Sequence, residues 1–440
     1  MINLFKKLMN IKVSMSFYVI TVLILFFFSI LFAAAVNHAK GFGASGRFEK
    51  IERLVLVISK IPFDALNIIT NKRFKINEHK NKKKGINTFV QDKESLSGYL
   101  LLPIYDLDRK ISKIDLYDIN NNVVIHSWNH KIDSINKISK LDRNLNNLER
   151  DHNSERFMVR HPLLLENGDI VFTAHRTPLV RIDKCSNLIW YNDNYFHHSI
   201  ENDNNGFIWS HLSNRNIEFN NELISDDLIV KVDLETGEIV YKKSIIEILL
   251  ENNLKDLITS SYVGVDPLHS NDVQPVLFDG KYWKKGDVFI SLRHISMAML
   301  YRPSNNKVIW HKQGPWRYNH DIDIIDEKTI ALFNNNNKLN GEPPDESNVL
   351  FYNFETKTVE NPYEKLFDKT KFSSEASGLF TMLENEDIIV EETVKSRIIR
   401  GNKEGVIKWE FIWDSLLNWS RFINKGEYND TINILKNSKC

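Results

Sequence analysis

Four segments of the sequence carry a histidine at or near the start of what reads as a β-strand. They are "RHPLLLENGDIVF" from 160, "HHSIENDNNGFIW" from 197, "HSNDVQPVLFDG" from 269 and "NHDIDIIDEKTIAL" from 319. Imidazole has a poor strand propensity, but it titrates near neutral pH and can serve as nucleophile, acid or base. One such histidine is more often a satisfied structural residue. Because the histidine recurs at four strand starts, we interpret these histidines as candidate functional residues.

Arginine follows in two of these units, where the second strand returns to the same end as the first. The segment "GDVFISLRHISMAML" from 286 carries Arg293 and His294, and "GDIVFTAHRTPLV" from 168 carries His175 and Arg176. A guanidinium is planar and permanently charged, so it can make several hydrogen bonds to one tetrahedral oxyanion. Zinc is the rival use of clustered imidazoles, but a nearby guanidinium would repel it. We therefore expect an anion site without a metal.

Short strands separated by Asn, Asp and Gly turns must position these residues, which is typical of an all-β protein. A hairpin recurs as "DINNNVVIHSW" at 118, "DKCSNLIWY" at 183, "DLETGEIVY" at 233, "PSNNKVIWH" at 303, "NFETKTVE" at 353 and "GNKEGVIKW" at 401. A four-stranded blade needs about 40 to 50 residues, so the repeat predicts a six-bladed β-propeller in which each hairpin is an outer pair of strands. The innermost strands should then place four histidines at equivalent positions around the channel: His161, His198, His269 and His320.

Composition excludes several other classes of protein. Lys plus Arg and Asp plus Glu both number 57, so the net charge gives no reason to expect a nucleic-acid partner. The sequence has no CxxC pair and no Walker-type loop. Cys185 and Cys440 lack metal-type spacing, and the sequence leaves open whether they form a disulfide.

A membrane segment stands near the N-terminus. Residues 13–36 contain no charge and are long enough to span a bilayer, and Lys6, Lys7 and Lys12 precede them. We favour an uncleaved, single-pass anchor in the inner (cytoplasmic) membrane, with the propeller on the periplasmic or other extracytoplasmic side. A cleaved signal peptide is the alternative, although its apolar region would be longer than the usual ~7 to 15 residues.

A helical segment at 49–70 and a basic segment at 71–85 follow the anchor. The basic segment reads as a solvated linker or as a contact for anionic headgroups or an acidic glycan. The predicted organisation is a cytoplasmic tail (1–12), a transmembrane anchor (13–36), a helical and basic linker (37–98), a six-bladed propeller (99–425) and a C-terminal tail (426–440).

The segments "HHSIE", "HSNDVQPV", "SLRHIS" and "NHDIDI", in this order, resemble bacterial arylsulfate sulfotransferases. The resemblance covers roughly residues 155–415. It implies a six-bladed propeller that moves a sulfuryl group from an aryl sulfate to a phenolic or other hydroxyl acceptor, through a sulfohistidine and without a nucleotide sulfate donor or other cofactor. The better-known members have an N-terminal β-domain and a closely spaced disulfide, which this sequence lacks, so donor and acceptor stay open.

The resemblance also assigns roles to single residues. It makes His320 the covalent nucleophile and Arg293 the sulfate clamp. His269 and His198 become acid/base and oxyanion partners, and Asn271 a hydrogen-bonding partner of the sulfate. Further candidates for substrate binding are His197, His294 and Arg176.

Two other functions remain open from the sequence. A membrane-anchored propeller without catalysis could hold a sulfated or otherwise anionic ligand or glycan with the same arginine and histidines. A tethered assembly factor would use the propeller rim and would need exposed apolar patches there. The sequence also leaves open whether the chain forms a homo-oligomer.

Overall fold

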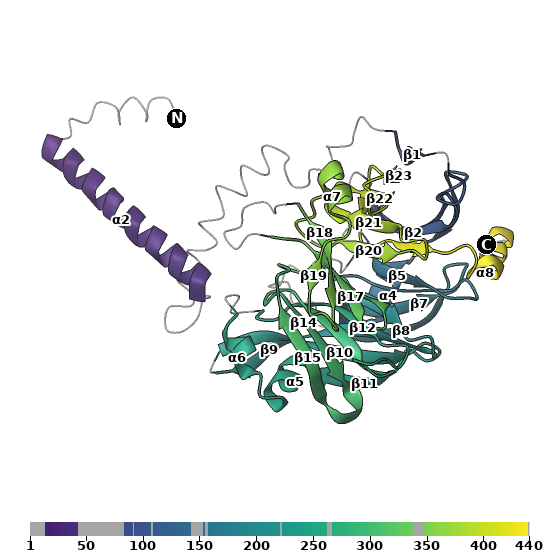
Figure 1. Ribbon diagram of the computed structural model, residues 1–440. Helices are drawn as coiled ribbons and strands as arrows, with labels where there is room; N and C mark the ends of the chain where they lie inside the picture. Colours follow the sequence, from purple (N-terminus) through teal and green to yellow (C-terminus); the bar gives the residue numbers. More distant parts are fainter. Residues whose placement is uncertain are drawn as a thin grey trace. The chain divides into compact units, whose positions relative to one another are not determined.

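Figure 1 shows a computed structural model of the chain. It describes residues 14–42, 83–90, 92–106, 109–141, 153–154, 157–220, 222–261, 266–337, 346–438 and 440. The chain divides into two compact units, residues 1–73 with 262–265, and residues 74–261 with 266–440. The predicted helix at 49–70 and most of the basic segment lie outside the described residues.

The first unit contains the helix α2 (Met15–Phe42). Its stretch Met15–Ala33 has 19 residues and a mean hydropathy of 2.5, so it is long and apolar enough to cross a membrane. A signal sequence would have the same properties. The helix therefore agrees with the predicted membrane segment without deciding between anchor and signal sequence.

The second unit is a β-propeller built from antiparallel sheets, so the predicted fold class is confirmed. Its first three sheets have these strand orders: β24 (Leu416–Leu417), β2 (Tyr99–Asp106), β3 (Ile111–Asp118), β4 (Val123–Trp128); β5 (Arg160–Leu164), β6 (Ile170–Thr173), β7 (Thr177–Ile182), β8 (Leu188–Asn202), β9 (Phe207–Phe219), β10 (Glu222–Asp233), β11 (Ile239–Ser244); and β12 (Ser270–Pro275), β13 (Val288–Leu292), β14 (Met297–Arg302), β15 (Lys307–Gln313).

The remaining two sheets have these orders: β16 (Ile322–Asp326), β17 (Thr329–Asn334), β18 (Asn348–Asn353), β19 (Val359–Glu360); and β20 (Leu379–Met382), β21 (Ile388–Glu392), β22 (Arg397–Gly401), β23 (Ile407–Ile412), β1 (Gly85–Thr88). Short helices connect or cover the strands: α4 (Ile132–Ile138), α5 (Ile245–Glu251), α6 (Lys255–Thr259), α7 (Glu364–Thr370) and α8 (Asn429–Asn437).

The sheets number five in the described residues, whereas six separate blades were predicted. The difference lies in β8, which is 15 residues long. Its first part pairs with β7, as in Tyr191 opposite Val180, and its second part pairs with β9, as in Glu201 opposite Trp209. The seven-stranded sheet thus consists of two four-stranded units that share β8, and only this division gives six units.

All six predicted hairpins are present as outer strand pairs: β3/β4, β7/β8, β10/β11, β14/β15, β18/β19 and β22/β23. Their turns follow the local chemistry of Asp and Asn side chains, which accept hydrogen bonds from amides two to four residues ahead. Asp183 Oδ1, for example, accepts from the N–H groups of Cys185 and Asn187, both at 2.8 Å.

The two ends of the second unit close the ring. The late strands β24 and β25 (Arg421–Ile423) both pair with β2, near the beginning of the propeller. Helix α8 buries Ile432 and Leu435 in the core formed with β2 to β7, and a disulfide joins Cys440 to Cys185 in the turn between β7 and β8. Residues assigned to the linker and the C-terminal tail from sequence therefore pack onto the propeller.

Candidate active site

The innermost strand of each four-stranded unit begins near a residue with a left-handed backbone. The φ angles of these residues lie between 41° and 63°: His161, His198, His269, Tyr318, Ser377 and Trp419. A positive φ is uncommon outside glycine, and such strain concentrates at functional sites. Three of the predicted histidines therefore share one structural position in successive units.

His320 does not share that position. Tyr318 takes the left-handed place in its unit, and His320 stands two residues later, where the preceding unit has Asn271. The prediction of four equivalent histidines is therefore wrong for His320. Its ring still reaches the cluster, because it is 4% exposed and lies 6.2 Å, centroid to centroid, from Trp419.

The histidines gather around Trp419, which the sequence analysis missed. The centroid of its ring lies 5.2 Å from that of His161 and 6.2 Å from that of His198. His198 in turn lies 5.1 Å from His269. Trp419 stands between β24 and β25, after the last predicted hairpin, so only the pairing of these strands with β2 would have placed it in the ring.

Arg293 and His294 lie beside His269, as the antiparallel strands predicted. The Arg293 N–H donates to the His269 carbonyl at 2.9 Å. The Arg293 guanidinium donates to His294 Nε2 at 2.8 Å and lies 4.8 Å above the ring of Tyr318. Since His294 Nε2 accepts this bond, its Nδ1 is the nitrogen that donates to the Asp266 carbonyl at 2.6 Å.

His320 is fixed at both ring nitrogens. Its Nδ1 lies 2.5 Å from Asn335 Oδ1 and 3.2 Å from the Tyr318 carbonyl. Its Nε2 accepts a hydrogen bond from the Ser377 N–H at 3.1 Å. Asn335 and Ser377 were not predicted, because they come from the next strand and the next unit.

His197 joins His198 to a buried carboxylate. The two Nδ1 atoms are 2.5 Å apart, so they share one proton between them. His197 Nε2 lies 3.1 Å from Asp227 Oδ1, at ion-pair distance. Burial alone would raise the pKa of Asp227. The positive charges of His197 and His269 outweigh burial and lower this pKa to about 2. His269 has a carboxylate of its own, since its Nδ1 lies 2.6 Å from Asp266 Oδ2.

Two further predicted residues are linked less directly to the cluster. Asn271 is fully buried and donates through Nδ2 to the Asn319 carbonyl at 2.9 Å, while its Oδ1 has no hydrogen-bond partner among the described residues. Arg176 follows His175, whose ring lies 6.3 Å from that of His198. The structure thus brings His197, His198, His269, Arg293, His294 and His320 together, whereas Asn271 and Arg176 are linked to the cluster only through their neighbours Asn319 and His175.

Burial keeps the central imidazoles neutral near physiological pH. It lowers the pKa of His320 well below the usual range, and the charge of Arg293 lowers that pKa further. Burial, followed by the charge of His197, has the same effect on His198. Neutral imidazoles next to a permanently charged guanidinium form a site suited to a group with negative oxygens.

A metal fits this site less well than an anion. Asp266, His269 and His294 have ligand atoms within 4.8 Å of one another. The Nδ1 atoms of His269 and His294 are already engaged, each at 2.6 Å, with the carboxylate and the carbonyl of Asp266. His294 Nε2 also already accepts a bond from Arg293.

The fold and the site define a propeller whose channel end carries imidazoles and a guanidinium. The sequence profile of the arylsulfotransferase (ASST) family matches residues 161–414, more than half of the chain. The chain therefore belongs to the arylsulfotransferase family. The predicted family is confirmed, and with it arylsulfotransferase activity as the general class of function.

Other comparisons give more distant likenesses. A search of curated proteins finds no match. A protein of unknown function from Bacteroides caccae has 11% identity and a TM-score of 0.46, covering 74% of this chain and 99% of its own. Virginiamycin B lyase from Staphylococcus aureus has 11% identity and a TM-score of 0.34, covering 57% and 69%. These TM-scores are too low to carry an argument.

Proposed function

We propose that this chain moves a sulfuryl group from an aryl sulfate to a phenolic or other hydroxyl acceptor in two displacements at one site. The observation that carries the proposal is that His320 is 4% exposed, with its pKa lowered by burial and by the charge of Arg293. A neutral imidazole can attack sulfur, whereas a protonated one cannot. Family membership supports the reaction class.

In the first displacement, His320 Nε2 attacks sulfur, the N–S bond forms and the bond from sulfur to the aryl oxygen breaks. The leaving oxygen takes a proton from His269, whose imidazolium Asp266 stabilises at 2.6 Å. In the second, His269 takes the proton of the acceptor hydroxyl, whose oxygen attacks sulfur, and the N–S bond breaks. Arg293 and His198 meet the charge on the sulfuryl oxygens in both displacements.

The other predicted residues would bind the substrate. Asn271 would donate to a sulfate oxygen through its Nδ2 amide, which donates to the Asn319 carbonyl at 2.9 Å in this structure. His197 would orient His198, and His294 would orient Arg293 through the bond at 2.8 Å. Arg176 would add positive charge at the rim beside His175. These roles use no metal and no cofactor.

We further propose that α2 is a retained anchor and that the propeller lies on the periplasmic or other extracytoplasmic side. The disulfide between Cys185 and Cys440 supports the extracytoplasmic location, because disulfides persist in oxidising compartments. The lysines before the apolar helix support the same orientation. We propose residues 13–36 as the anchor and 99–425 as the main body of the propeller, to which β1 adds an edge strand and α8 a covering helix.

One observation favours a second function, an anion-binding propeller without catalysis. The lone pair of His320 Nε2 accepts from the Ser377 N–H at 3.1 Å, and attack on sulfur must displace that bond. A purely binding protein would keep the Ser377–His320 hydrogen bond, while Arg293 and the histidines hold a sulfated or other anionic ligand or glycan.

A transfer assay distinguishes the two functions. The full chain is incubated with 4-nitrophenyl sulfate, with and without phenol, and nitrophenolate release is followed. The proposal predicts release that depends on the acceptor and gives parallel lines in double-reciprocal plots, as two-step transfer requires. Binding of the sulfate ester without release, over a range of phenols, would support the binding propeller instead.

A further inference from the structure

The side chain that holds His320 is a neutral amide, whereas the acid/base candidate His269 contacts the carboxylate of Asp266 at 2.6 Å. We propose that Asn335 is a positioning residue that keeps the His320 proton on Nδ1. Nε2 is then unprotonated, and its lone pair can attack sulfur. This inference rests on the function proposed above. Asn335 is fully buried directly after β17, and no sequence motif pointed to it.

The orientation of the Asn335 amide follows from its other partners. Its Nδ2 donates to the carbonyl oxygens of Ser374, at 2.8 Å, and Ser377, at 2.7 Å. Carbonyl oxygens only accept, so the NH₂ group must face them and Oδ1 must face His320. An oxygen 2.5 Å from His320 Nδ1 requires that this nitrogen carry the proton.

The opposite side of the ring gives the same answer independently. The Ser377 backbone N–H donates to His320 Nε2 at 3.1 Å, which requires an unprotonated Nε2. The Tyr318 carbonyl lies 3.2 Å from Nδ1 and is a second acceptor for the same proton. Both edges of the ring therefore select one tautomer.

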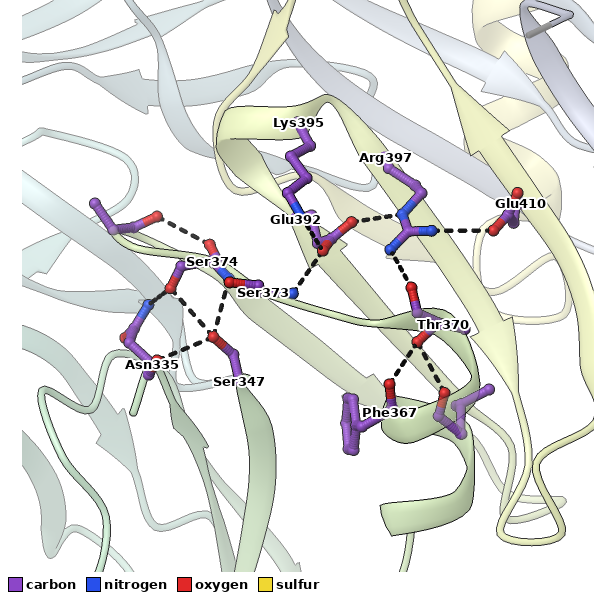
Figure 2. A network of polar contacts seen from close by, with 12 residues as sticks. Asn335, Ser347, Phe367, Thr370, Ser373, Ser374, Glu392, Lys395, Arg397 and Glu410 are labelled. Atoms are coloured by element: carbon purple, nitrogen blue, oxygen red, sulfur yellow. Dashed lines mark hydrogen bonds and ion pairs between the residues drawn. The ribbon is translucent and has the colours of Figure 1, made fainter. Parts of the chain in front are cut away.

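Figure 2 shows how the segment around Asn335 is held. Ser347 Oγ donates to the Asn335 carbonyl at 3.0 Å and accepts from the Ser374 N–H at 2.9 Å. The Ser373 N–H donates to Glu392 at 2.6 Å, and Glu392 pairs with Arg397. This network ties the strand of Asn335 to the next sheet, so the amide has little freedom to rotate away from His320.

The chemical difference between an amide and a carboxylate explains the division of roles. A carboxylate stabilises an imidazolium, as Asp266 can for His269 at 2.6 Å, and so suits an acid/base group. An amide orients the ring but carries no charge; the Asn335 bond raises the pKa of His320, and burial and the charge of Arg293 outweigh that effect. The charged and titratable groups that face His320 are Arg293, His269 and Arg160, and each opposes its protonation.

The test compares two neighbouring asparagines, Asn334 at the end of β17 and Asn335 directly after it. Asn335→Ala frees the His320 tautomer, whereas Asn334→Ala removes part-buried bonds to the Arg317 amide and to Asn348 without touching His320. We expect adduct formation with 4-nitrophenyl sulfate, per folded chain, to fall about tenfold or more in Asn335→Ala, the worth of one buried hydrogen bond. Asn334→Ala should keep the wild-type rate. A wild-type rate in Asn335→Ala, or equal losses in both, overturns the inference.

Asn335→Asp provides a second readout that does not depend on the amount of folded chain. A carboxylate at this position stabilises the His320 imidazolium, so the pH at which adduct formation is half-maximal should rise above the wild-type value. An unchanged pH profile overturns the inference.

If wild type forms no adduct at all, the proposed function fails, and a long-range ¹H–¹⁵N spectrum of histidine-labelled wild type still tests the tautomer. A proton on His320 Nε2 contradicts it.

Discussion

At the scale of single residues, the site depends on one guanidinium placed against several neutral rings. Arg293 is held by its own backbone, which pairs with the His269 carbonyl at 2.9 Å, and by His294 at 2.8 Å. Its planar fork can contact two oxygens of one sulfuryl group, whereas a lysine offers a point charge. Arginine is therefore the group whose geometry matters most for the rate.

Arg293→Lys should lower the transfer rate about 100-fold to 1000-fold, the usual effect of losing one donor to a developing oxyanion. The matched control is Arg302→Lys in the same sheet, because Arg302 pairs with Asp287 at 2.7 Å and has no contact with the site. Initial rates at saturating phenol measure both variants. Equal losses in the two would point to a general effect of arginine on the fold.

At the scale of elements, an ion pair repeats across the propeller. An acidic residue just before the second strand pairs with a basic residue of the third strand at 2.7 to 2.8 Å: Asp169 with Arg181, Asp203 with Lys231, Asp287 with Arg302 and Asp387 with Arg400. Each pair links the start of the second strand to the third strand of the same sheet, next to the inner strand that leads to the site.

Asp387→Ala should be strongly destabilising, because Asp387 and Arg400 are 5% and 4% exposed and the arginine would remain buried without its partner. Breaking such a pair costs about 3 to 5 kcal/mol of the free energy of unfolding. Glu346→Ala is the control, since its partner Lys371 is 75% exposed and should add nothing measurable. Urea denaturation compares them, and equal midpoints would contradict a structural role of the repeat.

Local chemistry explains which elements were predictable. The hairpins at 183 and 353 were recognised because Asp183 and Asn353 cap their own turns within a few residues. The two partners of His320 were not recognised. Asn335 and Ser377 contact His320 only after strands of different sheets have come together. His320 was placed in the cluster but assigned the wrong offset, since the left-handed turn at Tyr318 leaves no mark in the sequence.

At the scale of the whole molecule, the ring is closed twice. Strands β24 and β25 pair with β2, and the disulfide joins Cys440 to Cys185 across 255 residues. Trp419 lies in the first closure, so the site is complete only when both ends of the propeller are together. The sequence repeat reveals the hairpins, but it does not reveal which strands pair at the two ends of the chain. This long-range closure therefore could not be predicted from the repeat.

Cys185→Ser should lower the melting temperature markedly, because a cross-link across so long a loop stabilises by about 4 to 5 kcal/mol through the entropy of the unfolded chain. Cys440→Ser is the matched variant and should give the same melting temperature. Reductant should lower the wild-type value toward that of the variants and leave the variants unchanged. A wild-type melting temperature that does not respond to reductant would contradict this role.

The central claim, that His320 carries the sulfuryl group, is tested most directly by intact mass spectrometry. The full chain is mixed with excess 4-nitrophenyl sulfate without acceptor and quenched rapidly at alkaline pH, where an N-sulfo bond survives better than in acid. The account predicts one added sulfuryl mass in wild type, its loss on adding phenol, and none in His320→Ala. A wild-type chain without the added mass, or a His320→Ala chain that gains it equally, would contradict the account.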